Sequence, residues 1–213
     1  MKHHPLFFII ILALITTSAT GQTDTLSVSA IHTRWVPLVG TTLLASGTLF
    51  SVQPELHRRS IEMRDALQID GHSQLRFDDY AQFIPIATSA MLNICGVEGK
   101  HSLKRLSLLS GTSFLIGMTA LEAGKYGFHV QRPNGHGFTS FPSGHTWFAF
   151  TGAEILRREY GADYPWIAVG GYIVAATIGF MRMYNNRHWF SDVVAGAGLG
   201  MLCVSVSYKL WGE

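Results

Sequence analysis

The sequence predicts an all-α protein, a helical bundle embedded in a membrane with about five or six core helices. Hydrophobic residues make up 47% of the 213 residues and charged residues only 14%, whereas globular chains are roughly a quarter charged. The apolar residues gather in long stretches with almost no charge. A net charge of +2, without a basic run or an aromatic platform, argues against nucleic acid as a partner.

The chain begins with what we predict to be an export signal, residues 1–21. Lys2 precedes an apolar run from Leu6 to Ile15, and small residues follow as far as Gly21. We expect cleavage after Gly21, and the alternative is a leader that remains as an uncleaved anchor helix. Either form directs the chain to the bacterial inner membrane or beyond.

Later apolar stretches are predicted to be helices at membrane depth, although each is slightly shorter than the ~20 residues that a spanning helix needs. A shorter stretch, Thr146–Leu156, carries Glu154 and is expected to pack inside the bundle. The small residues of the last two apolar stretches favour close contact between helices. The apolar stretches are Trp35–Ser51, Tyr80–Val97, Leu106–Leu121, Pro165–Met181 and Val193–Tyr208.

The polar region Gln53–Asp79 is expected to be a water-exposed connection with one amphipathic helix at most. We therefore expect N-terminal helices and this connection over residues 22–79, and a catalytic core over residues 80–213. Nothing in the composition indicates a linker to a second domain.

Three polar clusters lie in the connections of the second half of the chain. They supply three cations, two imidazoles and one carboxylate, and no cysteine or carboxylate cluster that could hold a metal. Three cations suit the binding of a doubly charged phosphate and of its transition state. In an up-and-down bundle, the connection after Leu106–Leu121 and the connection after Pro165–Met181 lie on the same side of the membrane. We therefore expect the clusters to lie together at one end of the bundle. The clusters are Lys125 with Arg132-Pro133, Pro142-Ser143-Gly144-His145, and Arg182 with His188 and Asp192.

The last cluster indicates an activated nucleophile. His188 and Asp192 are four residues apart at a predicted helix start, so both face the same side. The carboxylate can hold one ring nitrogen and leave the other free to attack phosphorus. An isolated His/Asp pair at this spacing would usually be a surface ion pair, but Arg182 close by makes that interpretation less favourable.

The other two clusters supply phosphate ligands and an acid. Ser143 is expected to cap a helix whose free backbone N–H groups, with Gly144, suit a phosphate oxygen. His145 would protonate the leaving oxygen. Arg132 can hold two phosphate oxygens at once, while Lys125 acts as a point charge.

These motifs resemble the type 2 phosphatidic acid phosphatase (PAP2) superfamily, which also includes bacterial acid phosphatases and vanadium haloperoxidases. The family pattern places a lysine six residues before Arg-Pro, then Pro-Ser-Gly-His, then Ser-Arg, five residues, a histidine, three residues and an aspartate. Each motif residue is present except that Met181 replaces the serine before Arg182. The resemblance covers roughly residues 80–210.

The resemblance implies a PAP2/haloperoxidase-like bundle and a metal-independent phosphatase without a cofactor. A phosphohistidine would form on His188, with Asp192 orienting the ring and His145 acting as acid and then as base. Lys125, Arg132, Arg182 and the Ser143-Gly144 backbone would bind the phosphate. The expected substrate is a lipid phosphate held in the bilayer: a lipid A phosphate, undecaprenyl pyrophosphate, phosphatidylglycerophosphate or phosphatidic acid.

The distribution of lysine and arginine predicts an active site on the periplasmic face, with Lys100 and Arg157 in cytoplasmic connections. A cleaved leader is compatible with this only if Trp35–Ser51 lies along the interface without spanning, which is what we expect. Two alternatives stay open: a soluble periplasmic acid phosphatase acting on small phosphate esters, and a catalytically idle membrane scaffold or flippase-like protein.

Overall fold

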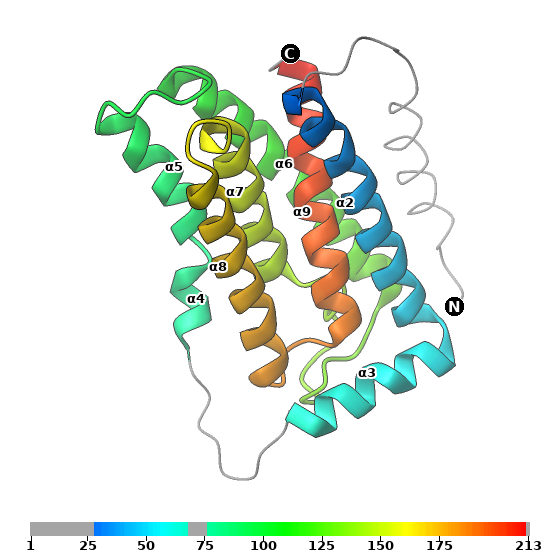
Figure 1. Ribbon diagram of the computed structural model, residues 1–213. Helices are drawn as coiled ribbons and strands as arrows, with labels where there is room; N and C mark the ends of the chain where they lie inside the picture. Colours follow the sequence, from blue (N-terminus) through cyan, green and yellow to red (C-terminus); the bar gives the residue numbers. More distant parts are fainter. Residues whose placement is uncertain (1–27, 68–75, 212–213) are drawn as a thin grey trace.

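The computed structural model describes residues 28–67 and 76–211, and every regular element within these ranges is a helix (Figure 1). The prediction of an all-α bundle is confirmed. The predicted leader, residues 1–21, lies outside the described ranges. In chain order the elements are α2 (Val28–Val52), α3 (Pro54–Leu67), α4 (Phe77–Ala81), α5 (Ile84–Ile94), α6 (Leu103–Phe128), α7 (Gly144–Tyr160), α8 (Pro165–Tyr184) and α9 (Phe190–Trp211).

Helix α9 lies at the centre of the bundle and packs against α2, α6 and α7. Small residues allow this close approach. A Cβ on Gly198 would lie 2.4 Å from the backbone nitrogen of Leu44 in α2, and a Cβ on Gly196 would lie 2.6 Å from the carbonyl oxygen of Ser143 before α7. Both distances are too short for any side chain, so these glycines bring the helix backbones together as the small-residue pattern predicted.

Helix α7 packs inside the bundle, as we predicted for the stretch Thr146–Leu156 because it carries Glu154. Glu154 has no exposed surface. Its carboxylate accepts hydrogen bonds of 2.7 Å from Nε and Nη2 of Arg157, and one of 2.8 Å from Nε of Arg158. A buried carboxylate paired in this way is stable in the interior of the bundle.

The outer helices present an apolar surface. Leu115 of α6, Met91 of α5 and Ile173 of α8 are large hydrophobic side chains that are all exposed. Within the described ranges, four helices are long and apolar enough to cross a membrane: α2 over Trp35–Val52, α6, α8 and α9. A surface of this kind is suited to lipid, and the chain is a membrane protein.

The structure differs from the expectation that the first apolar stretch lies along the interface. Helix α2 runs antiparallel to α9: Gly47 approaches Ala195 near the start of α9, and Gly40 approaches Leu202 further along it. It lies beside α9 over most of its length (Figure 1). A helix packed lengthwise on a spanning helix must cross the same layer, so α2 spans if α9 does.

The predicted stretch Tyr80–Val97 divides into two helices. A proline at the first turn of α5 favours a helix start there, and residues 77–81 form the separate short helix α4. The expected domain boundary between residues 79 and 80 therefore falls inside α4. This matters because α4 contributes two side chains to the candidate site.

In the described part of the polar connection, α3 is the amphipathic helix expected there, and the last residues of the connection, 77–79, belong to α4. Helix α3 lies across one end of the bundle, beside the ends of α8 and α9 (Figure 1). The ring of His57 packs edge-on against Trp189 with centroids 5.0 Å apart, and the guanidinium of Arg64 lies 5.4 Å from the centroid of the same indole. Trp189 follows His188 directly, so α3 covers one side of the turn that carries the predicted nucleophile.

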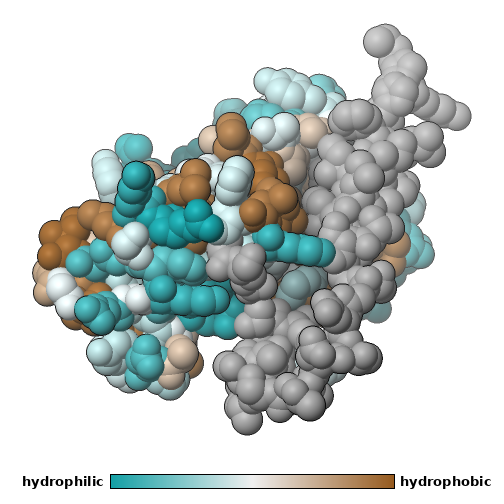
Figure 2. Space-filling view, turned by 90° about the horizontal axis from the view of Figure 1, so that it is seen from above, coloured by the Kyte–Doolittle hydropathy of each residue, from teal (hydrophilic) through white to brown (hydrophobic). Residues whose placement is uncertain are grey.

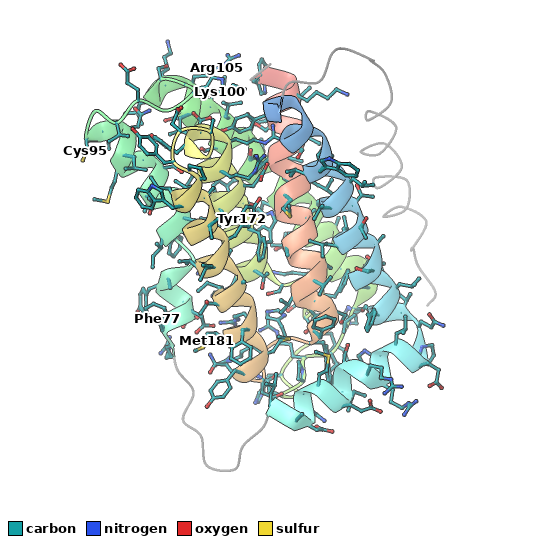
Figure 3. The ribbon with its side chains drawn as sticks, in the orientation of Figure 1. Phe77, Cys95, Lys100, Arg105, Tyr172 and Met181 are labelled. Atoms are coloured by element: carbon teal, nitrogen blue, oxygen red, sulfur yellow. The ribbon has the colours of Figure 1, made fainter. Side chains whose placement is uncertain are left out.

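The end of the bundle opposite α3 is hydrophilic (Figure 2). Viewed from the end opposite α3, hydrophilic residues gather on the face and hydrophobic ones border it (Figure 2). Lys100, Arg105 and Cys95 lie at this end, whereas Phe77 of α4 and Met181 of α8 lie toward the other (Figure 3).

Candidate active site

The three predicted clusters meet at the end of the bundle where α6 and α8 finish and α7 and α9 begin (Figure 1). The backbone N–H of Ser143 donates to the carbonyl oxygen of Asp192 at 3.0 Å, which joins the second cluster to the third. A Cβ on Gly144 would lie 3.9 Å from Nζ of Lys125, which joins the first cluster to the second. The expected convergence is therefore present.

His188 is buried and its ring is held in one tautomer. Its Nδ1 lies 2.8 Å from the carbonyl oxygen of Ser140 and 3.5 Å from Oδ2 of Asp192. A carbonyl can only accept, so Nδ1 carries the proton and Nε2 keeps its lone pair. The closest acceptor is thus a backbone carbonyl and not, as expected, Asp192 alone, because His188 lies in the turn before α9 and not in its first helical turn.

Asp192 holds this arrangement together from the first turn of α9. Its Oδ2 accepts hydrogen bonds from the Ser140 hydroxyl at 2.6 Å and from the backbone N–H of Trp189 at 2.8 Å, and its Oδ1 lies 3.4 Å from the Ser191 hydroxyl. The carboxylate has no exposed surface. It therefore ties the loop before α7 to the turn before α9 while it faces the imidazole.

The charge state of His188 suits a nucleophile. Burial lowers the pKa of His188 below its ordinary value, and the guanidinium groups of Arg182 and Arg132 act in the same direction, while Asp192 opposes them. A neutral imidazole is the form that can attack phosphorus.

His145 lies in the first turn of α7 and remains partly open to solvent, with 28% of its side chain exposed. Its Nε2 is 3.2 Å from Oδ1 of Asp79. Burial, followed by the charge of Arg182, lowers the pKa of His145 to about 4, although Asp79 raises it. A dianionic phosphate beside this ring would raise that pKa again, because an opposite charge favours the protonated form.

Arg182, in the last turn of α8, is almost completely buried. Its Nη1 lies 2.5 Å from Oδ2 of Asp78 and 3.3 Å from Oδ1 of Asp79. Asn185 donates to the other oxygen of Asp78 at 3.2 Å. The buried Nε of Arg182 has no hydrogen-bond partner among the described residues. A buried guanidinium N–H without an acceptor is suited to an anionic ligand.

Arg132 lies in the loop between α6 and α7. Burial lowers the pKa of its guanidinium, and the positive charges of Arg182 and Arg187 lower it further. Three guanidinium groups close enough to repel one another form a strongly positive site that a phosphate would stabilise. Sequence reasoning predicted two of these three arginines.

Lys125 lies inside α6, whereas we expected it to follow a helix ending at Leu121. The helix continues through Gly124 and Gly127 to Phe128, and it ends at His129, whose backbone is left-handed. The Nζ of Lys125 is 3.3 Å from Oε1 of Glu122 and points toward the start of α7.

Ser143 occupies the N-cap position of α7, but its side chain does not cap the helix. Its Oγ accepts a hydrogen bond of 2.9 Å from Thr146, and its N–H is used by Asp192. The N–H expected to be free at Ser143 is therefore occupied. The amides of the first turn, from Gly144 onward, have no acceptor within an α-helix.

Besides Arg187, sequence reasoning missed four residues of the site: Asp78, Asp79, Ser140 and Asn185. The two aspartates lie about a hundred residues before Arg182 in a region that the sequence indicated only as polar. Ser140 acts partly through its backbone oxygen, which has no side-chain signal. The adjacent acidic pair before an apolar stretch is the one feature that could have suggested α4.

The fold and this site define the class of protein. Residues 107–213 match the family described as the PAP2 superfamily. The chain belongs to this superfamily.

Individual relatives agree with this class. The chain is 35% identical over 176 residues to a lipid A 1-phosphatase of Porphyromonas gingivalis, covering 81% of this chain and 37% of that protein. It is 28% identical over 134 residues to a lipid A 1-phosphatase of Helicobacter pylori, covering 61% of this chain and 68% of that protein. The chain thus spans little more than a third of the length of the Porphyromonas relative. Among solved structures, LpxE of Aquifex aeolicus matches the fold with a TM-score of 0.56 and 21% identity, over 70% of this chain and 94% of that one.

Proposed function

We propose that this protein removes the 1-phosphate of lipid A through a phosphohistidine on His188, at the periplasmic face of the inner membrane. The observation that carries the proposal is the state of the His188 ring. Its Nδ1–H is occupied by Ser140 at 2.8 Å, so Nε2 is free to attack beside Arg182 and Arg132. The two lipid A 1-phosphatase relatives support the choice of substrate.

The reaction would proceed in two displacements. Nε2 of His188 attacks phosphorus, a P–N bond forms as the P–O bond to the sugar breaks, and the leaving oxygen takes a proton from His145. A water molecule then attacks the phosphohistidine while His145 accepts one of its protons. This step releases inorganic phosphate and restores the neutral imidazole of His188.

The phosphoryl oxygens would be bound by cations and backbone amides, without a metal. Lys125 and Arg132 approach from the α6 side, the Nε–H of Arg182 from the α8 side, and the amide of Gly144 from the first turn of α7. Fixed donors of this kind stabilise the charge that develops in a phosphoryl transition state.

The acyl chains of the substrate would remain in the bilayer beside the apolar outer helices. This surface disfavours the alternative of a soluble acid phosphatase, because four helices with exposed hydrophobic side chains do not suit a protein in water. The ordered nucleophile disfavours the alternative of an idle scaffold.

The end of the bundle opposite the site supports this orientation: Lys100 lies just before α6, Lys104 and Arg105 lie at the start of α6, and Arg157 and Arg158 lie in the last turn of α7. Clusters of this kind favour the cytoplasm. Because α2 starts at that same end, a spanning α2 and a periplasmic site require that residues 1–21 are not removed as a secretory signal. The sequence expectations of cleavage and of a periplasmic site exclude each other once α2 spans, and we retain the second.

The test is phosphate release by the detergent-purified protein in EDTA, from lipid A, undecaprenyl pyrophosphate, phosphatidylglycerophosphate and phosphatidic acid. We expect release from lipid A, limited to the 1-phosphate, and its loss in His188→Ala. Preferential turnover of another lipid would overturn the substrate, and activity that survives in His188→Ala would overturn the mechanism.

A further inference from the structure

The two aspartates of α4 differ in how they contact the site. Asp78 is buried, with 1% exposure, and both of its oxygens are held, one by Arg182 and the other by Asn185. The side chain of Asp79 is 33% exposed. Its Oδ1 is 3.3 Å from Nη1 of Arg182 and 3.2 Å from Nε2 of His145. Asp78 is thus a fixed partner of Arg182, whereas Asp79 reaches the site from its rim.

Asp79 contacts two groups that the proposed function assigns to the substrate. Arg182 would hold a phosphoryl oxygen, and His145 would contact the oxygen that leaves. A carboxylate oxygen and a phosphate oxygen are acceptors of the same kind and charge, and they repel each other at short range. Asp79 therefore competes directly with a substrate phosphate for Nε2 of His145. At Arg182 it holds Nη1, and its charge opposes a phosphate at the neighbouring Nε–H of the same guanidinium.

The surroundings of Asp79 allow it to leave. Its second oxygen, Oδ2, is 3.3 Å from Nε of Arg76, whose side chain is 80% exposed. When Oδ1 is displaced, the carboxylate keeps this partner and gains water, so it is not left buried without a hydrogen bond. Helix α4 is only five residues long, and a side chain at its exposed edge needs no repacking of the core to turn outward.

Resting on the proposed function, we infer that Asp79 is a specificity-determining residue: its carboxylate is an internal competitor that a substrate phosphate must displace from Arg182 and His145. Only a ligand that binds the cationic site more strongly than a single carboxylate displaces Asp79 readily. The dianion of a phosphate monoester carries one more charge than a carboxylate, whereas a phosphodiester is a monoanion like the carboxylate itself. Asp79 therefore favours terminal phosphates over diesters and over the acidic head groups of bulk lipids.

The test compares wild type with Asp79→Asn, which keeps the shape and removes the charge. Competitive inhibition constants are measured for orthophosphate and for dimethyl phosphate, a monoanionic diester. Two charge-assisted hydrogen bonds no longer need to be broken in the variant, so we expect orthophosphate to bind about 10-fold more tightly. Dimethyl phosphate should gain more than orthophosphate, because Asp79 is inferred to select against the monoanionic diester. An equal gain for both ligands would overturn the role in specificity. The alkaline limb of kcat/KM should move to lower pH, because His145 loses a carboxylate that favours its protonated form.

Two controls separate this role from a structural one. Asp78→Asn removes a carboxylate from the same helix but loosens Arg182, so it should weaken orthophosphate binding. Asp79→Ala should reproduce the tighter binding of Asp79→Asn. Unchanged or weaker inhibition in both Asp79 variants would overturn the inference, because a purely structural residue does not oppose the ligand.

The outcome is distinguishable from failure of the proposed function. If wild type releases phosphate from no lipid, the function is wrong, and orthophosphate binding is then compared by calorimetric titration of the same proteins. Tighter binding to Asp79→Asn than to wild type would support the competitor without catalysis. Equal binding would overturn it.

Discussion

The replacement Ser140→Ala tests how the nucleophile is held. The Ser140 hydroxyl donates to Oδ2 of Asp192 at 2.6 Å, and neither side chain has exposed surface. Removing the hydroxyl leaves that oxygen with the Trp189 amide and with Nδ1 of His188, which is 3.5 Å away. A hydrogen bond to a charged group contributes about 1.5–3 kcal/mol. Since about 1.4 kcal/mol corresponds to a factor of ten in rate, full transfer of this loss to the transition state lowers kcat about 10- to 100-fold.

The assay is phosphate release at saturating and at low lipid concentration. KM should change little, because Ser140 touches none of the residues assigned to the phosphate. Ser191→Ala is the matched control: its hydroxyl faces the other oxygen of Asp192 at 3.4 Å, and so weak a contact should cost less than about 3-fold in kcat. Equal losses in both variants, or a Ser140→Ala defect confined to KM, would refute this account of how His188 is held.

Three further predictions follow from the structure. The folded protein holds the pKa of His145 at about 4, below its ordinary value of 6.5. Between these two pH values the unfolded chain binds more protons than the folded protein, so the melting temperature should fall as the pH drops from 6.5 to about 4. The fall should be smaller in His145→Gln. Glu154→Ala leaves two arginines without their buried partner and should lower the free energy of unfolding by about 3–5 kcal/mol. The control Glu55→Ala removes an exposed ion-pair residue and should lower it by at most about 1 kcal/mol. Similar losses in both variants would show that the buried pair is not stabilising. Cys95 is exposed while the chain's other cysteine is buried, so in intact spheroplasts a membrane-impermeant maleimide should label a cysteine introduced at Asn134 but not Cys95, and the reverse pattern would place the active site in the cytoplasm.

The sequence predicted the bundle and the principal members of the site because both leave local signals. A membrane helix is a continuous apolar stretch, and the clusters around Lys125, Ser143 and His188 interrupt such stretches at motif spacing. Helix ends were less predictable. The α-helical conformation continues through polar residues such as Lys125, so an apolar stretch ends several residues before the helix that contains it.

The parts that escaped prediction depend on contacts between distant segments. Asp78 meets Arg182 across 104 positions of sequence, and the backbone oxygen of Ser140 meets the His188 ring across 48. Neither contact follows from residue type or local spacing. The first apolar stretch was assigned to the interface by an argument about topology, whereas its close packing along α9 depends on glycines in both helices.

The position of Asp192 has a consequence for biogenesis. Its carboxylate joins the loop that follows α6 to the turn that follows α8, so the imidazole of His188 is oriented only when the hairpins on both sides have entered the bilayer and closed on each other. A half-inserted chain exposes the same motif residues without an ordered nucleophile. Under the proposed mechanism, phosphatase activity therefore requires completed assembly of the bundle, and a half-inserted chain would not attack the phosphates around it.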